Sequence, residues 1–302
     1  KVFTSVVQPN PQVGTLTGGN PNLGPEKART LTLGTSFTPS FLPNFSISLD
    51  AYRIKLDGAI SNLGGTIQNT FDLCYTILKD TSSQACQAIR RDPSSGEITS
   101  NINTDPYYVQ QFYANTGGIK TSGLDISTSY RFDVPWFSQS GRLTLISDIG
   151  YVDEYTLTPV QELPSVRNEC VGSYGATCGL PIPRWKAPSR IVYSDAIFTF
   201  SLSHRYTGSV TRDNYLLPLR KGLTPPAKTD VTAQRVKAYN YFDLSMIVNL
   251  PEEFKISAGV TNVFDKQPPL LGSGALTWGL NTAPGVYDIY GRSFFIGLNK
   301  KF

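Results

Sequence analysis

The sequence predicts an all-β protein, an antiparallel transmembrane β-barrel, and three observations support this fold class. Apolar residues recur at every second position along much of the 302-residue chain, the period of a strand with one apolar face. The connections between these segments alternate between short and long, as they do in membrane barrels. No stretch approaches the ~18 apolar residues of a membrane-spanning helix, which excludes a helical membrane protein.

Composition and charge exclude several other classes. Hydrophobic residues make up 40% of the chain and charged residues 17%, against ~25% charged in a typical soluble domain, so the chain is not disordered. The net charge of +4 is mild, and no run of Lys or Arg forms a nucleic-acid patch. One His and four Cys provide little material for a metal site. We therefore predict no nucleic-acid partner, no metal and no cofactor.

The alternation predicts nine strands. In the clearest of them Phe242, Leu244 and Met246 oppose Asp243 and Ser245. The nine predicted strands are residues 31–37, 45–52, 124–132, 143–151, 190–193, 196–206, 242–250, 254–261 and 293–299.

The predicted connections are of two kinds. Those at 39–44, 134–141, 194–195 and 251–253 are short, and those at 60–117, 158–183, 208–236 and 265–288 are long. A compact soluble domain rarely has several structureless loops longer than ~12–15 residues. An outer-membrane barrel has short periplasmic turns and long extracellular loops by construction, and its sheet closes because lipid cannot hydrogen-bond a free backbone edge.

The cysteines form two pairs that are close in sequence, and neither pair is a CxxC. We predict disulfides between Cys74 and Cys86 and between Cys170 and Cys178, each closing a loop in a long connection and contributing about 3 kcal/mol. Such bonds indicate an oxidising compartment. Apolar residues at helical spacing within 71–90 predict a short loop helix held by the first pair.

Four segments carry a resemblance to TonB-dependent outer-membrane receptors. Asn-Pro-Asn-Leu-Gly-Pro-Glu-Lys at 20–27 resembles the segment that opens a barrel strand, and Cys-Gln-Ala-Ile-Arg-Arg at 86–91 resembles a Cys-bearing loop. Gly-Val-Thr-Asn-Val-Phe-Asp at 259–265 is similar to the penultimate strand and its exit. Tyr-Gly-Arg-Ser-Phe-Phe-Ile-Gly-Leu at 290–298 resembles the closing strand.

The resemblance implies a 22-stranded barrel in the bacterial outer membrane, plugged by an N-terminal domain that receives energy from TonB. Nine strands cannot close such a barrel, so we expect about its last nine strands, with the plug and the earlier strands absent. We expect residues 1–27 to be an extracellular tail and 28–302 the C-terminal barrel portion. The implied partners are outer-membrane lipid, TonB through the missing N-terminal part, an imported small molecule, and the barrel-assembly machinery, which would read the terminal Phe302.

Candidate site residues fall on strands and in the long connections. Five charged residues alternate with apolar neighbours, so we expect them to point into the lumen in structural or solvating roles: Asp125, Arg131, Asp148, Arg205 and Asp243. Aromatic and cationic residues in the long connections could contact a ligand by stacking and charge-assisted hydrogen bonds: Tyr107, Tyr108, Tyr113, Arg212, Tyr215 and Trp278. His204 has no second His or Cys nearby, so we assign it no ligand role.

Three functions remain open: an importer energised by TonB, a passive porin or channel, and a secreted β-sandwich binding module. No nucleophile elbow, Walker loop or dinucleotide fingerprint is present, so we predict no catalytic residue and no enzyme. Apolar rows that recur without a covering helix and the loop lengths favour a membrane protein, and the resemblance favours the importer. The cargo stays open among siderophore-like, cofactor-like and oligosaccharide-like solutes.

Overall fold

The computed structural model describes residues 13–62, 67–99, 101–115, 117–135, 138–159, 165–226, 234–272 and 281–301. The chain divides into two compact units. The first comprises residues 1–29, 54–120 and 156–168, and the second comprises residues 30–53, 121–155 and 169–302. Within the described residues, none of the helices is long and apolar enough to cross a membrane.

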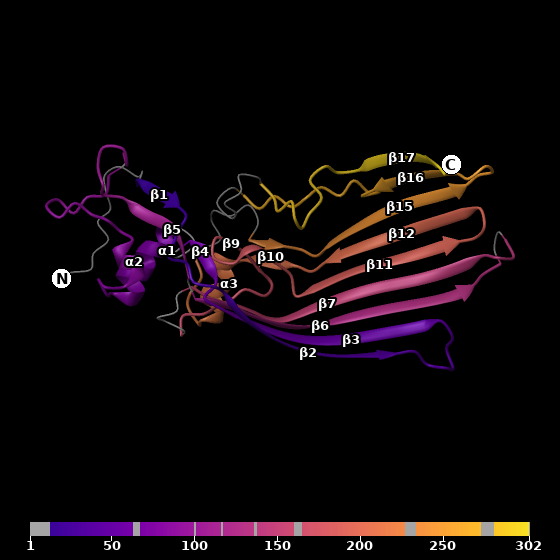
Figure 1. The fold of residues 1–302 in the computed structure, drawn as a ribbon, viewed down its shortest axis with the longest axis horizontal. Coiled ribbons are helices and arrows are strands. Elements are labelled where there is room, and N and C mark those ends of the chain that lie inside the picture. The colour runs from indigo at the N-terminus through magenta and orange to yellow at the C-terminus, as the bar shows by residue number, and fades with distance from the viewer. Residues whose placement is uncertain are drawn as a thin grey trace. The chain divides into compact units, whose positions relative to one another are not determined.

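The main sheet contains the nine strands that the alternation predicts (Figure 1). Their order in the sheet is the order of the chain, so each inner strand pairs with the one before it and the one after it. The two-residue strand β8 (Asn168–Glu169) adds to β7. The nine strands are β2 (Lys27–Phe37), β3 (Phe45–Asp57), β6 (Gly118–Asp133), β7 (Arg142–Thr158), β11 (Trp185–Ser194), β12 (Phe198–Thr207), β15 (Tyr239–Asn249), β16 (Phe254–Thr261) and β17 (Ser293–Lys300).

Most of these strands are longer than the alternation predicts. For example, β7 has 17 residues, and it continues past the predicted end at Tyr151 to Thr158. The alternation thus located each strand but stopped short of the end of β7, whereas the predicted connection at 158–183 begins where β7 ends.

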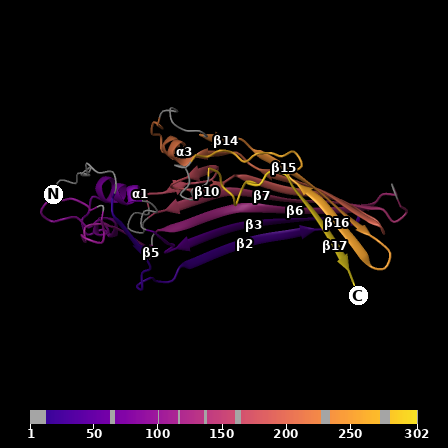
Figure 2. The ribbon, with the colours of Figure 1, turned by 90° about the horizontal axis from the view of Figure 1, so that it is seen from above.

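Two strands form the edges of the main sheet. In Figure 2 the strands β2, β3, β6 and β7 can be followed side by side, and β17 leads to the C-terminus. β2 pairs only with β3 and β17 only with β16 among the described strands. Apolar side chains of β17 are widely exposed, and Ile296 is 83% exposed. The sheet is therefore open, as expected for a part of a larger barrel.

The first unit places secondary structure in the N-terminal segment and in the predicted connection at 60–117. Strands β1 (Thr15–Gly18), β5 (Val109–Asn115) and β4 (Ile60–Asn62) form a three-stranded sheet in the order β1-β5-β4. The helix predicted within 71–90 is three short pieces instead: α1 (Ile67–Phe71), the π-helix η1 (Asp72–Leu78) and α2 (Gln84–Gln87). The break follows Lys79, which adopts a left-handed conformation with φ 51°.

The second unit also orders its long connections. Strands β10 (Gly179–Ile182), β9 (Ser173–Gly175), β13 (Val210–Arg212) and β14 (Arg235–Val236) form a four-stranded sheet in this order, and α3 (Asp213–Arg220) follows β13. We call these four strands and α3 the loop layer. The sequence shows no alternation in these segments because they are only two to eight residues long.

Candidate ligand-binding site

The register of β12 and β15 separates an apolar face of the main sheet from a polar one. Phe200 pairs with Met246, and both are 42% exposed. Ser203 pairs with Asp243, and both lie on the opposite face because successive side chains of a strand alternate. In a membrane barrel the exposed apolar row faces lipid. The Ser203 face is therefore the inward face.

Arg205 lies on this inward face and holds two carboxylates. Its Nε and Nη2 donate to Asp243 at 2.8 and 3.0 Å, and its Nη1 and Nη2 donate to Asp288 at 2.9 and 2.6 Å. The guanidinium carbon lies 4.9 Å from the centre of the Tyr241 ring. Asp243 is on the neighbouring strand β15, whereas Asp288 belongs to the connection that leads into β17. One side chain thus ties the sheet to that connection.

The turn after β16 is fixed to the same carboxylate. The Asn262 N–H donates to Asp243 Oδ1 at 2.8 Å, and the Asn262 amide exchanges two hydrogen bonds with the backbone of Lys266 at 3.0 and 2.8 Å. Asp265 then accepts a hydrogen bond from the Arg292 N–H at 2.9 Å. Asp265 therefore joins the two segments that resemble the end of a receptor barrel, and Asn262 fixes the turn between β16 and Lys266.

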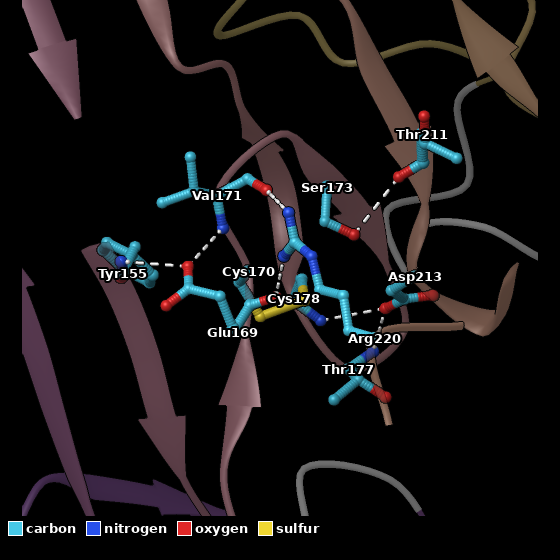
Figure 3. The surroundings of a disulfide bond; sticks show 10 residues. All are labelled: Tyr155, Glu169, Cys170, Val171, Ser173, Thr177, Cys178, Thr211, Asp213 and Arg220. Carbon is cyan, nitrogen blue, oxygen red and sulfur yellow. Dashed lines mark hydrogen bonds between the residues drawn. A yellow bond between two sulfur atoms is a disulfide. The ribbon is translucent and has the colours of Figure 1, made fainter. Parts of the chain in front are cut away.

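A second cluster surrounds the disulfide between Cys170 and Cys178 (Figure 3). Asp213, the first residue of α3, is 3% exposed, and its Oδ2 accepts hydrogen bonds from the Thr177 N–H at 2.7 Å and the Cys178 N–H at 2.9 Å. Gly175 approaches this carboxylate so closely that a Cβ at Gly175 would lie 2.1 Å from Asp213 Oδ1. The carboxylate therefore fixes the end of the disulfide loop.

The start of the same loop is fixed by Glu169 and Arg220 (Figure 3). Glu169 Oε1 accepts hydrogen bonds from the Tyr155 N–H at 3.2 Å and the Val171 N–H at 2.9 Å. Arg220, the last residue of α3, donates to the carbonyl oxygen of Glu169 and, at 2.7 Å, to that of Val171. Burial lowers the pKa of the Arg220 guanidinium from its ordinary value. The helix α3 thus holds both ends of the disulfide loop.

A core of apolar and aromatic side chains lies beside these clusters. It includes Tyr174 of β9, which is 0% exposed, and Tyr287, which is 1% exposed. Burial raises the pKa of both phenols. The remaining buried members are Val210, Val236, Leu271 and Ala283, with Tyr239 and Val286 packed against them. The loop layer and the connection before β17 therefore share one core.

The first unit has its own core and disulfide. Cys74 and Cys86 are bonded, and Leu73, Ala85 and Val109 are buried around them. Next to this core, Arg91 donates from Nε to the Tyr75 hydroxyl and from Nη1 to the Gly96 carbonyl, each at 2.8 Å. These contacts brace the loop that follows α2.

The predicted ligand-contacting residues fall in both units. In the first unit Tyr107 and Tyr108 precede β5, and Tyr113, which is 49% exposed, lies within it. In the second unit Arg212 ends β13 and Tyr215 lies in α3. Trp278 and Phe302 are outside the described residues. Tyr113, Arg212 and Tyr215 are thus carried by regular elements rather than by irregular loops.

Several organising residues escaped the sequence analysis. Asp213, Glu169 and Asp288 were not distinguished from other acidic residues, because their partners lie far away along the chain. Asn262 and Asp265 were inside a segment quoted for the family resemblance, which was the available signal. His204 stacks on Phe242 at 4.7 Å. In the described part of the chain, no three His, Cys, Asp or Glu side chains are grouped to hold a metal ion.

An open antiparallel sheet with an apolar outward face, a polar inward face and ordered long connections defines a portion of an outer-membrane β-barrel. The sequence matches the family described as TonB dependent receptor-like, β-barrel, over residues 2–263. The chain belongs to this family, whose members reside in the outer membrane. The sequence matches no curated protein.

Three solved structures illustrate the fold similarity. A mutant of the ferric enterobactin receptor PfeA from Pseudomonas aeruginosa in complex with enterobactin is 14% identical, with a TM-score of 0.55, and the match covers 94% of this chain and 32% of that one. The siderophore receptor PirA from Acinetobacter baumannii is 15% identical, with a TM-score of 0.50 and coverages of 93% and 32%. The FrpB iron transporter from Neisseria meningitidis is 15% identical, with a TM-score of 0.50 and coverages of 97% and 32%. The chain therefore spans about a third of the length of these receptors.

Proposed function

We propose that the protein is an outer-membrane receptor that imports a scarce solute with energy supplied through TonB. The observation that carries this proposal is a polar inward face joined to an ordered, disulfide-braced loop layer, in a chain of the TonB-dependent receptor-like family. A receptor needs such preorganised groups because each side chain ordered on binding costs affinity. No bond chemistry is required of any residue. The cargo class is siderophore-like, cofactor-like or oligosaccharide-like.

The predicted aromatic and cationic residues are the proposed ligand contacts. Tyr113 presents half of its side chain to solvent, and a phenol ring offers both a stacking face and a hydroxyl. Arg212 offers a planar cation for charge-assisted hydrogen bonds. The other proposed contacts are Tyr107, Tyr108, Tyr215 and Trp278.

The proposed partners follow from the same function. TonB would act through an N-terminal plug, and outer-membrane lipid would cover the apolar face of the sheet. The barrel-assembly machinery would read the closing strand β17 and Phe302. Among the described strands β17 pairs only with β16, which supports the last proposal, since an unpaired edge is a template for another strand.

An uptake experiment in paired host strains tests the proposed function. The protein would be produced in outer membranes of strains with and without TonB, and each strain would be offered labelled ferric siderophores, a corrinoid and an oligosaccharide. Uptake of one solute that disappears without TonB is expected. Equal uptake in both strains would instead identify a passive channel and refute the proposal.

Matched variants test the proposed contacts. Arg212→Gln should weaken binding of the imported solute. Arg235→Gln is the control, because Arg235 pairs with Thr211 on the neighbouring strand and so lies on the face opposite Arg212. Equal binding by the Arg212 variant and the control would remove Arg212 from the proposed contacts.

A further inference from the structure

Residues 281–288, in the yellow segment that leads into β17 in Figure 1, dock on the loop layer and the sheet at two points. We call these residues the strap. At the first point Ala283 and Tyr287 are buried in the shared core, and the Tyr287 ring lies 5.0 Å from the ring of Tyr239. At the second point Asp288 binds Arg205, and its N–H donates to the Tyr241 hydroxyl at 3.3 Å.

Arg205 can release the strap without losing its other partner. Its Nε and Nη2 remain on Asp243, and Asp243 keeps the hydrogen bond from the Asn262 N–H. With the strap docked, two carboxylates share one guanidinium, so the cluster carries an excess negative charge. Because like charges repel, the repulsion between Asp243 and Asp288 offsets part of the attraction between Asp288 and Arg205.

The docked strap also leaves two hydroxyl groups without partners. Among the described residues, the buried side-chain polar atoms that lack a hydrogen bond are Thr282 Oγ1 and Tyr287 Oη, and both belong to the strap. A buried hydroxyl without a partner loses the hydrogen bonds that it makes in water. Undocking would restore these bonds to both groups.

We propose that the strap is a two-state element that undocks from the loop layer and the inward face, with Arg205 as its latch. Apolar burial of Ala283 and Tyr287 and the Asp288 ion pair favour the docked state. The excess charge and the two unpaired hydroxyls oppose it, so the two states are close in free energy. Elements that open locally have such a balance. This inference concerns conformation and does not require the proposed transport function.

Hydrogen exchange of the strap amides tests the proposal in the whole protein purified from outer membranes. Tyr287→Phe removes an unpaired hydroxyl and keeps the ring, so exchange in the strap should slow by about tenfold. Asp288→Asn weakens the latch and should accelerate exchange by about tenfold. The control is Tyr290→Phe, the same change at a side chain that is 89% exposed, which should leave exchange unchanged.

The opposite signs of the two effects separate a latch from a general change in stability. Exchange of amides in β12 and β15 should stay the same in all variants, because the sheet does not open with the strap. Slower exchange in Tyr287→Phe together with faster exchange in Asp288→Asn would support the two-state strap. Any other pair of results, including an effect equal to that of the Tyr290→Phe control, would overturn it.

Discussion

Replacing Asp213 should loosen the loop layer without unfolding the main sheet. In Asp213→Ala the N–H groups of Thr177 and Cys178 lose their acceptor. Cys178 is 6% exposed, so its N–H would be left buried and unpaired at a cost of about 1–3 kcal/mol. The half-buried Thr177 N–H can regain water, so its loss adds about 1 kcal/mol. The total is about 2–4 kcal/mol for the opening of the disulfide loop.

Hydrogen exchange measures this change directly. Because about 1.4 kcal/mol corresponds to a factor of ten, the amides of Thr177 and Cys178 should exchange about 30- to 1,000-fold faster in Asp213→Ala. Asp213→Asn is the matched variant, since its amide oxygen can still accept both hydrogen bonds but without the charge. We expect it to lie between wild type and Asp213→Ala.

Two results would refute this reasoning. If Asp213→Ala exchanged within threefold of wild type, the carboxylate would not hold the loop. If the amides of β12 and β15 accelerated as much as those of Thr177 and Cys178, the effect would be global, and the loop layer would not open separately from the sheet.

Three further perturbations follow from the structure. Replacing Cys170 and Cys178 with Ser removes a cross-link between residues separated by 8 positions. This change should destabilise the loop layer by ~2.6 kcal/mol on the chain-entropy model. The measurement is the midpoint of a denaturant titration in which proteolytic cleavage of the loop reports its unfolding, and this midpoint should be lower in the variant. Backbone hydrogen bonds from Phe198 and Ile197, with a contribution from the Tyr193 hydroxyl, lower the pKa of Asp195 in the turn between β11 and β12. The ionised Asp195 should therefore stabilise the turn fully above the unfolded pKa of ~3.9, and this stabilisation should be lost as the pH falls through the lower folded pKa. Asp195→Asn should abolish this pH dependence when hydrogen exchange of the turn amides is followed in a pH titration. Gly259→Ala should reduce the amount of folded protein in the outer membrane, because a Cβ at this position would lie 2.4 Å from the Phe295 ring and 2.7 Å from the Leu244 carbonyl oxygen. A normal amount of folded protein would show that β16 and β17 can separate enough to accommodate the added methyl group.

The sequence predicted the strands of the main sheet well because their side chains obey a local rule. A residue such as Leu244 is apolar because of its own position on a strand that faces lipid, whatever its distant partners are. The ends of the strands were less predictable. The alternation of β7 was followed only to Tyr151, whereas the strand continues to Thr158, where the predicted connection begins.

The candidate site was predicted only in part, because its contacts join distant parts of the chain. Arg205 was expected on the inward face, but its partner Asp288 is 83 residues away, and Asp213 is 35 residues from Cys178. No pattern in a single sequence distinguishes these acidic residues from solvated ones. The cysteines were easier, since the close spacing within each pair is itself informative.

The direction of the two edge strands restricts what can complete the barrel. The nine main strands pair in chain order and alternate in direction, so β2 and β17 point the same way (Figure 1). Direct pairing of β2 with β17 would be parallel, unlike the antiparallel pairs of β7, β11, β12, β15, β16 and β17. A fully antiparallel cylinder therefore needs an intervening set with an odd number of strands. Parity alone thus excludes closure by one added hairpin, or by any whole number of hairpins.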